Sequence, residues 1–296
     1  MPLYIGIDGG GSKTACVLGD ENSVLASSRS AGSNVIRLGE KYAAASLQSA
    51  ISQACCTAQV SPLKVQAACV GASGAGRPEV QEQIRALLGS ILPRSSVRVI
   101  GDNEIAHEAA LLGRPGVVVI AGTGSVAYGR NQRGETARAG GYGLAVSDEG
   151  SGQWIGREAI AKALRAGNTS LLTAAMRHWQ LSSQEALIQF VNRSPAPDFS
   201  SLFPLLLSAA RTGEAMAKSV LQAAGCELAT LTDNVLRQLW REGDPVRVGL
   251  VGGVFANSPE VRLAFLLTLR ECWPTTAVSF QIADPVLGAL SIARQM

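Results

Sequence analysis

Charged and aromatic residues are scarce in this chain, and several diagnostic patterns are missing. Charged residues make up 17% of the 296 residues and aromatic residues 5%, with a formal net charge of +3. Basic residues form no run of five or six, so the charge does not indicate a nucleic-acid or membrane surface. No apolar run reaches the ~18 residues of a membrane span, and a core-like strand at 4–8 stands where a signal peptide would lie. The sequence therefore predicts a cytoplasmic protein without nucleic-acid or membrane partners.

Cysteine and histidine are too few and too scattered for a metal centre or a disulfide framework. The six cysteines contain no Cys-x-x-Cys pair, and the two histidines, His107 and His178, have no Cys or His at zinc spacing. We therefore expect structural histidines and reduced thiols.

Glycine, by contrast, is abundant, with 32 residues gathered in a few clusters. The stretches "YIGIDGGGSKTACVLGD" (4–20) and "GVVVIAGTGSVAYGRN" (116–131) share one pattern: an apolar strand, a turn of small residues and a second strand. We interpret them as an internal repeat. Two domains are predicted, 1–112 and 113–296, and it is left open whether the last helix, 284–296, packs back on the first domain.

The periodicity of apolar residues predicts the remaining elements. Helical spacing indicates helices over 39–59, 77–92 and 258–272, and short apolar runs indicate strands over 96–103 and within 246–257. Strands followed by crossover helices predict an α/β fold with partly parallel sheets.

Both glycine turns offer backbone N–H groups that can converge on one anion, because glycine lets the backbone approach closely. Neither is a P-loop or a dinucleotide fingerprint, since a strand and not a helix follows each turn. The alternative is that each is an ordinary hairpin turn. The predicted phosphate contacts are Gly10, Gly11, Ser12, Lys13 and Thr14 in the first turn, and Gly122, Thr123 and Gly124 in the second.

Three aspartates stand next to glycine-rich segments. Asp8 ends the first strand, where a Mg²⁺ ion would face ATP oxygens. Asp102 ends a predicted strand and is placed to accept the proton of an attacking hydroxyl. Asp148 lies in a glycine loop and can hydrogen-bond substrate hydroxyls, while Glu149 or Ser151 caps the next helix. The alternative for each aspartate is a cap or turn residue.

Nine stretches along the chain resemble the N-acetylglucosamine kinase branch of the BadF/BadG/BcrA/BcrD-type ATPases, within the actin-like sugar kinase superfamily. They are "GIDGGGSKT", "SAGSN", "GASGAG", "GDNEIA", "IAGTGS", "GGYG", "SDEGSGQWIG", "LVGGVF" and "ADPVLGA". They follow the family's order over nearly the whole chain. The resemblance implies a two-lobed actin-like ATPase fold of class α/β, with duplicated ribonuclease H-like domains and a central cleft.

The resemblance also implies ATP and Mg²⁺ as cofactors, with Asp8 toward the metal and Asp102 as the catalytic base. The implied adenosine contacts are Gly252, Gly253 and Ala256. The implied sugar contacts are Asn34, Ser73, Gly74, Asp102, Ser125, Gly141, Tyr142, Gly143 and Asp148. Tyr142 stands where many members carry Trp, and Val126 replaces a polar residue of some members, so the N-acetyl pocket departs from the family pattern.

These observations lead to the hypothesis of an ATP-dependent hexosamine kinase. Its acceptor is the 6-hydroxyl of N-acetylglucosamine or of a close relative, glucosamine or N-acetylmuramic acid, and the resemblance alone implies a homodimer. The alternative is an activator-type ATPase that couples ATP hydrolysis to a partner enzyme through a [4Fe–4S] cluster. That cluster needs two suitably placed thiolates, whereas Cys16, Cys55 and Cys69 lie in apolar patterns. A sugar-sensing module without turnover is a third option, against which Asp102 argues.

Overall fold

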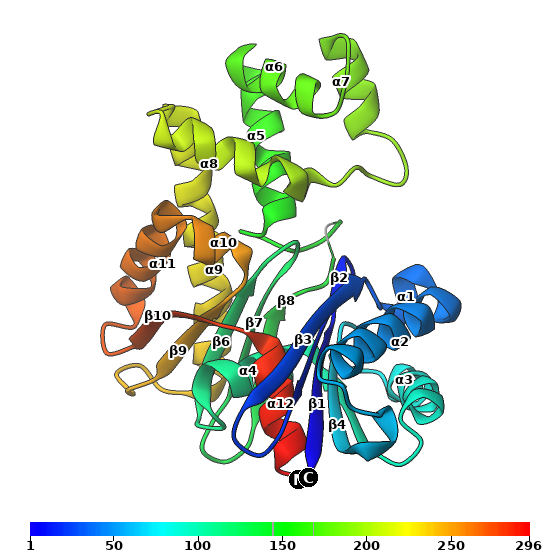
Figure 1. The fold of residues 1–296 in the computed structure, drawn as a ribbon. Helices are drawn as coiled ribbons and strands as arrows, with labels where there is room; N and C mark the ends of the chain where they lie inside the picture. Colours follow the sequence, from blue (N-terminus) through cyan, green and yellow to red (C-terminus); the bar gives the residue numbers. More distant parts are fainter. Residues whose placement is uncertain (144, 168) are drawn as a thin grey trace. The chain divides into compact units, whose positions relative to one another are not determined.

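A computed structural model describes residues 1–143, 145–167 and 169–296, which form two units (Figure 1). The first unit comprises Met1–Arg114 with Ala283–Met296, and the second comprises Pro115–Ile282. Each unit has one five-stranded sheet. In the described part of the chain, no helix has the length and apolarity that a membrane crossing requires.

The first sheet has the strand order β3-β2-β1-β4-β5. The strands are β1 (Leu3–Gly9), β2 (Lys13–Gly19), β3 (Val24–Ala31), β4 (Val65–Ala72) and β5 (Ser96–Gly101). β1 and β2 pair antiparallel, as do β2 and β3, while β1, β4 and β5 run parallel. The carboxyl ends of these three parallel strands therefore meet at one edge of the sheet.

Helices cover both faces of the first sheet. They are α1 (Val35–Leu38), α2 (Glu40–Thr57), α3 (Pro78–Ile91), α4 (Asp102–Leu111) and α12 (Pro285–Arg294). Successive residues of a strand point to opposite faces, so Ile5 and Ile7 pack with the apolar sides of α2 and α3, and Tyr4 packs with α4 and α12. Figure 1 shows α12 beside β1 and α4.

Two glycines let α12 lie very close to its neighbours. A Cβ built on Gly6 of β1 would lie 2.6 Å from the Val286 carbonyl oxygen, and one on Gly288 of α12 would lie 2.7 Å from the Ala109 amide nitrogen. Backbone atoms cannot move aside as a flexible side chain can.

Replacing Gly6 with Ala is therefore expected to lower the free energy of unfolding by about 3 kcal/mol, because overpacking against rigid backbone forces the helix off the sheet. Urea unfolding measures this change. Gly89→Ala in α3 is the matched control: its Cβ meets nothing within 4 Å, and alanine in a helix should raise stability by roughly 0.5–1 kcal/mol. Equal stability of the two variants would contradict the close packing of α12.

The second sheet has the order β10-β9-β6-β7-β8. Its strands are β6 (Gly116–Ala121), β7 (Ser125–Arg130), β8 (Thr136–Gly140), β9 (Arg247–Val251) and β10 (Ala277–Ala283). β6, β7 and β8 pair antiparallel in succession, and β6 pairs parallel with β9. Taken from the other edge, the order β8-β7-β6-β9-β10 corresponds strand by strand to β3-β2-β1-β4-β5 of the first sheet. The predicted internal repeat is therefore confirmed.

The helices of the second unit pack on one large apolar core. They are α5 (Gly152–Ala166), α6 (Thr169–His178), α7 (Gln184–Val191), α8 (Phe203–Arg211), α9 (Ala215–Leu239), α10 (Gly253–Asn257) and α11 (Pro259–Cys272). α9 contributes the most buried residues, and Phe255 and Phe265 meet edge to face beside it.

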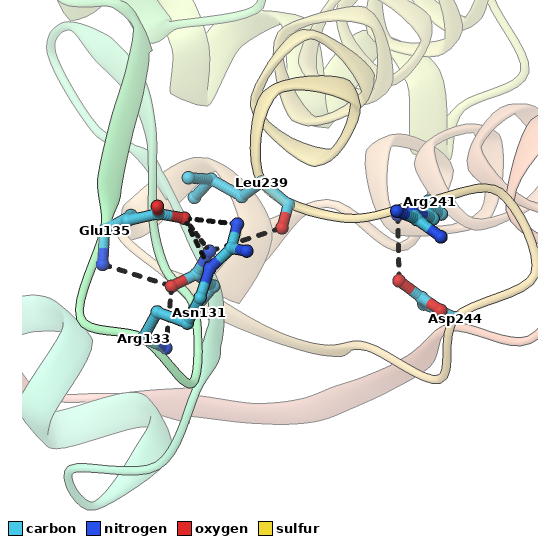
Figure 2. A network of polar contacts seen from close by, with 6 residues as sticks. All are labelled: Asn131, Arg133, Glu135, Leu239, Arg241 and Asp244. Atoms are coloured by element: carbon cyan, nitrogen blue, oxygen red, sulfur yellow. Dashed lines mark hydrogen bonds and ion pairs between the residues drawn. The ribbon is translucent and has the colours of Figure 1, made fainter.

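A buried amide fixes the turn between β7 and β8 (Figure 2). The Asn131 side-chain oxygen accepts hydrogen bonds from the backbone N–H groups of Arg133 and Glu135, and its Nδ2 donates to the Glu135 carboxylate at 2.6 Å. The same Nδ2 lies 3.4 Å from the carbonyl oxygen of Leu239, the last residue of α9. The turn between β7 and β8 is thereby tied to the end of α9.

Candidate active site

Strand register brings the predicted catalytic segments of the first unit to one sheet edge. Gly9 of β1 pairs with Ala72 of β4, and Ala72 pairs with Gly101 of β5. The residues that follow these three strand ends are the first glycine turn, Ser73 and Asp102. Asp102 is the first residue of α4 and not the last of a strand as the sequence suggested, because the chain turns helical directly after Gly101.

The first glycine turn joins β1 to β2 and keeps part of its backbone unpaired. The Gly10 N–H donates to the Lys13 carbonyl oxygen at 3.0 Å. The N–H groups of Gly11 and Ser12 make no hydrogen bond to any residue that the structure describes, and Ser12 and Lys13 are exposed. Two free N–H donors beside an ammonium group have the chemistry of an anion site.

Thr14 differs from its neighbours in the turn. Its side chain is fully buried, and its hydroxyl donates to the Ala31 carbonyl oxygen at 2.7 Å and lies 2.8 Å from the Ser33 hydroxyl. The alternation of β2 turns this residue into the sheet, where its hydroxyl binds β3, and a phosphate contact at Thr14 stays a prediction.

Asp8 carries an unfavourable charge at the end of β1. Burial, with the nearby negative charges of Asp102 and Asp284, raises the pKa of Asp8 to about 6, although Lys13 acts in the opposite direction. Asp284 caps α12, with its carboxylate accepting from the Val286 N–H at 3.3 Å. Asp284 was not predicted as a site residue, because its position near Asp8 depends on the return of the chain to the first unit.

The Asp102 carboxylate is held by two donors. Ser73 Oγ donates to Oδ2 at 2.7 Å, and the Asn103 N–H donates to Oδ1 at 3.0 Å. Ser73 is therefore adjacent to Asp102, while Gly74, which follows, has a φ of +87° that favours glycine.

Two further residues of the first unit lie near the turn. Asn34 caps α1, and its side-chain oxygen accepts from the Arg37 N–H at 3.0 Å, so the amide NH₂ group is what remains for a ligand. Arg37 Nη1 lies 3.5 Å from where a Cβ on Gly11 would be. Arg37 was not predicted as a site residue, because a single arginine three residues after the "GSN" motif forms no recognisable pattern.

The second glycine turn joins β6 to β7 in the second unit. The Gly122 N–H donates to the Gly124 carbonyl oxygen at 2.9 Å, and the turn carbonyls of Gly122 and Thr123 accept from the first two N–H groups of α5, at 2.8 and 3.2 Å. Among the described residues, the N–H groups of Thr123 and Gly124 have no partner. A Cβ on Gly122 would meet nothing within 4 Å, so space for a bound group stays open beside this turn.

Asp148 lies against this turn. It is buried in a left-handed conformation (φ +70°) that is strained for a residue with a side chain, and its Oδ1 accepts from the Ser125 N–H at 3.2 Å. Burial raises the pKa of Asp148, and this hydrogen bond opposes the shift. The Ser125 hydroxyl donates to the Glu149 carbonyl oxygen at 2.6 Å, and Ser151 caps α5 as predicted.

The glycine loop of the second unit surrounds an exposed aromatic ring. Gly141 and Gly143 have φ of +71° and +95°, and a Cβ on Gly141 would lie 3.2 Å from Cβ of Val126. Tyr142 between them is 60% exposed, and the Arg138 guanidinium lies over its ring at 5.0 Å. The predicted loop residues are therefore contiguous with Ser125 and Asp148 in this unit.

Gly252 is required by packing within the second unit. It has a φ of +105°, and a Cβ there would collide with the backbone of Ala121. Gly253 and Ala256 are exposed at the start of α10. The glycine at 252 thus has a structural explanation, and an adenosine contact remains a prediction for Gly252, Gly253 and Ala256.

The duplicated sheets, each with a glycine turn after its first strand, define an actin-like ATPase fold. The crystal structure of a ROK family glucokinase from Streptomyces griseus in complex with glucose and AMPPNP matches with a TM-score of 0.63 at 18% identity, over 99% of this chain and all of that one. A candidate N-acetylglucosamine kinase from Chromobacterium violaceum matches with a TM-score of 0.75 at 25% identity, over 98% of both chains.

The chain belongs to the BadF/BadG/BcrA/BcrD ATPase family, whose model matches residues 5–292. Among curated relatives, the N-acetylmuramic acid/N-acetylglucosamine kinase of Clostridium acetobutylicum is 32% identical over 99% of both chains. Fold class and family resemblance, as predicted from the sequence, are confirmed.

Proposed function

We propose that this protein is an ATP-dependent kinase that phosphorylates the 6-hydroxyl of an amino hexose. The observation that carries the proposal is the Asp102 carboxylate, held by two donors at the sheet edge that also carries the first glycine turn. Family membership and the likeness to a curated hexosamine kinase support the same function.

The two glycine turns are proposed to bind ATP phosphates. Gly11, Ser12, Thr123 and Gly124 offer unpaired N–H groups among the described residues, and Lys13 adds a positive charge in the first unit. We add Arg37 to the phosphate contacts because its guanidinium lies beside Gly11. Such fixed donors lower the barrier to phosphoryl transfer mainly through positioning and charge stabilisation.

Mg²⁺ fits the environment of Asp8. The described part of the chain contains no cluster of three or more metal-ligating side chains, but Mg²⁺ typically uses one or two carboxylates together with phosphate oxygens and waters. A cation would offset the burial and the nearby negative charges that raise the pKa of Asp8. When bound with ATP, the ion would neutralise charge on the phosphates, and Asp8 would hold it directly or through water.

Asp102 is proposed to act as the general base. It accepts the proton of the sugar 6-hydroxyl as that oxygen bonds to the γ-phosphorus and the bond from the γ-phosphorus to the bridging oxygen of ADP breaks. The products are the sugar 6-phosphate, ADP and a proton on Asp102. We assign sugar hydroxyl contacts to Asn34 and Gly74 in the first unit, and to Asp148 and the Gly141–Gly143 loop in the second.

The burial of three of the cysteines argues against the alternative, an activator-type ATPase that needs two thiolates to hold a [4Fe–4S] cluster. Burial raises the pKa of Cys16 and of Cys69 to about 12, so neither thiol is a ready thiolate. Cys55 is buried as well, and the exposed cysteines are Cys56 in the first unit and Cys226 and Cys272 in the second.

A coupled ADP-release assay over five sugars tests the proposal. We expect turnover with at least one of N-acetylglucosamine, N-acetylmuramic acid and glucosamine. We expect a kcat/KM at least about tenfold lower with N-acetylmannosamine, whose acetamido group at C2 is inverted, and with glucose, which has a hydroxyl there, because groups that bind the 2-amino substituent are then left unpaired. ADP release at one rate with and without every sugar would overturn the kinase assignment and favour the ATPase.

The positive charge of Arg138 is expected to affect the relative kcat/KM of two sugars in this panel, N-acetylmuramic acid and N-acetylglucosamine. No salt bridge of Arg138 occurs among the described residues, and its cation lies over Tyr142 in the sugar loop. This charge favours a hexosamine with a carboxylate, so Arg138→Gln is expected to lower kcat/KM for N-acetylmuramic acid about 3–10-fold relative to N-acetylglucosamine. Arg133→Gln, at an exposed arginine paired with Glu135, is the control.

A further inference from the structure

The hydrogen bond between Ser73 and Asp102 gives Ser73 a role different from the sugar contact that family resemblance implies. Ser73 Oγ lies 2.7 Å from Asp102 Oδ2 and donates to it. A serine hydroxyl has one proton, and a hydroxyl bound to a carboxylate at this distance makes a strong, charge-assisted hydrogen bond. Its proton is therefore engaged by Asp102 and is not offered to a ligand.

Ser73 is itself fixed in place by the sheet. Its N–H donates to the Gly9 carbonyl oxygen at 3.1 Å, so its backbone is bound to the last residue of β1. The preceding residue, Ala72, is buried at the end of β4, and its carbonyl oxygen accepts from the Ala75 N–H at 3.0 Å. The hydroxyl of Ser73 thus extends from a rigid position.

Without this hydroxyl, the Asp102 carboxylate would lose the hydrogen bond that ties it to a distant segment of the chain. The second donor to the carboxylate, the Asn103 N–H, belongs to the next residue of the same helix. Rotation about χ2 of an aspartate is broad, so one local donor leaves the plane of the carboxylate poorly defined.

We propose that Ser73 is a positioning residue, which orients the Asp102 carboxylate for proton acceptance, and that it does not determine sugar affinity. The inference rests on the proposed kinase function. It predicts that loss of the hydroxyl lowers kcat and leaves the affinity for the sugar unchanged.

Three variants test this role: Ser73→Ala, Ser73→Thr and Ser95→Ala. Ser73→Ala is expected to lower kcat about 10–100-fold, since misplacing a catalytic group costs up to about this much, with KM and calorimetric Kd for the sugar within twofold of wild type. Ser73→Thr keeps the hydroxyl and should retain at least a third of kcat. Ser95→Ala removes another serine hydroxyl, which donates to the Val65 carbonyl oxygen at 2.7 Å, and should leave kcat unchanged.

A double-mutant cycle separates this role from general damage to the fold. In an Asp102→Asn background, Ser73→Ala is expected to change kcat less than twofold, because the base that it positions is gone. The proposal is overturned if Ser73→Ala raises the sugar KM tenfold at constant kcat, if Ser73→Ala retains wild-type kcat, or if its cost persists in the Asp102→Asn background. A wild-type protein that phosphorylates no sugar overturns the proposed function instead.

Discussion

Replacing Asp102 with Asn should lower kcat about 10²–10⁴-fold, while the sugar still binds with nearly wild-type affinity. This loss is typical of removing a general base. Asn has the shape of Asp, and its side-chain oxygen can still accept from the Asn103 N–H. The Ser73 hydroxyl can rotate and accept from the new NH₂ group, so no buried polar group is left unpaired.

Two measurements check this result. Coupled ADP release with the best hexosamine gives kcat, and calorimetry without nucleotide gives the Kd for the sugar. Turnover above about a tenth of wild type would refute the role of Asp102 as the base. Asp198→Asn, at an exposed helix-capping carboxylate of the second unit, is the control and should keep kcat.

Asp8→Asn is expected to abolish Mg²⁺-dependent turnover and at the same time to stabilise the unliganded protein. Loss of the carboxylate that we propose to face the metal should lower kcat by on the order of 10²-fold or more. The pKa of Asp8 is about 6 in the folded protein, against an ordinary value of 3.8. A difference of about two units corresponds to up to about 3 kcal/mol.

The sign of the stability change follows from proton binding. Because the pKa of Asp8 is raised on folding, the folded state holds the proton more tightly between about pH 4 and 6. The free energy of unfolding therefore falls as the pH rises through this range, and the whole cost is present above about pH 7. Asp8→Asn removes this cost, so its gain in stability should be largest at pH 8 and nearly absent at pH 4.

Thermal unfolding at pH 4, 6 and 8, without nucleotide or Mg²⁺, measures this dependence. Asp20→Asn is a control of opposite sign, because the N–H groups of Asn22 and Ser23 lower the pKa of the Asp20 carboxylate, and removing its charge should destabilise the protein at pH 8. An Asp8→Asn protein that is less stable than wild type at pH 8 would show that the ionised Asp8 carboxylate does not destabilise the folded protein.

Much of the architecture was predictable, because patterns of neighbouring residues along the sequence determine where most helices and strands form. Apolar spacing predicted the helices that became α2, α3 and α11, and the repeated turn between apolar strands predicted two related sheets. The edge strand β10 was not predicted, since its residues are mostly exposed or half-buried and show no alternation.

The site was harder to predict, because contacts between distant segments determine what each side chain can do. The positions of Asp8 and Asp102 at the ends of predicted strands were sufficient to single them out. The commitment of the Thr14 hydroxyl to Ala31, the closeness of Arg37 to Gly11 and the approach of Asp284 to Asp8 all depend on tertiary packing. No local pattern encodes these three contacts.

The return of α12 to the first unit has a consequence for biosynthesis. α12 covers the sheet face that includes Tyr4, Val17 and Cys69, yet its residues leave the ribosome only after the whole second unit has been made. At roughly 5–20 residues per second, this face stays uncovered for on the order of ten seconds or more. The second unit is one continuous segment, 115–282, and can meanwhile fold. The first unit is complete only after α12 has been synthesised, so the unit whose translation begins first is the last to finish folding.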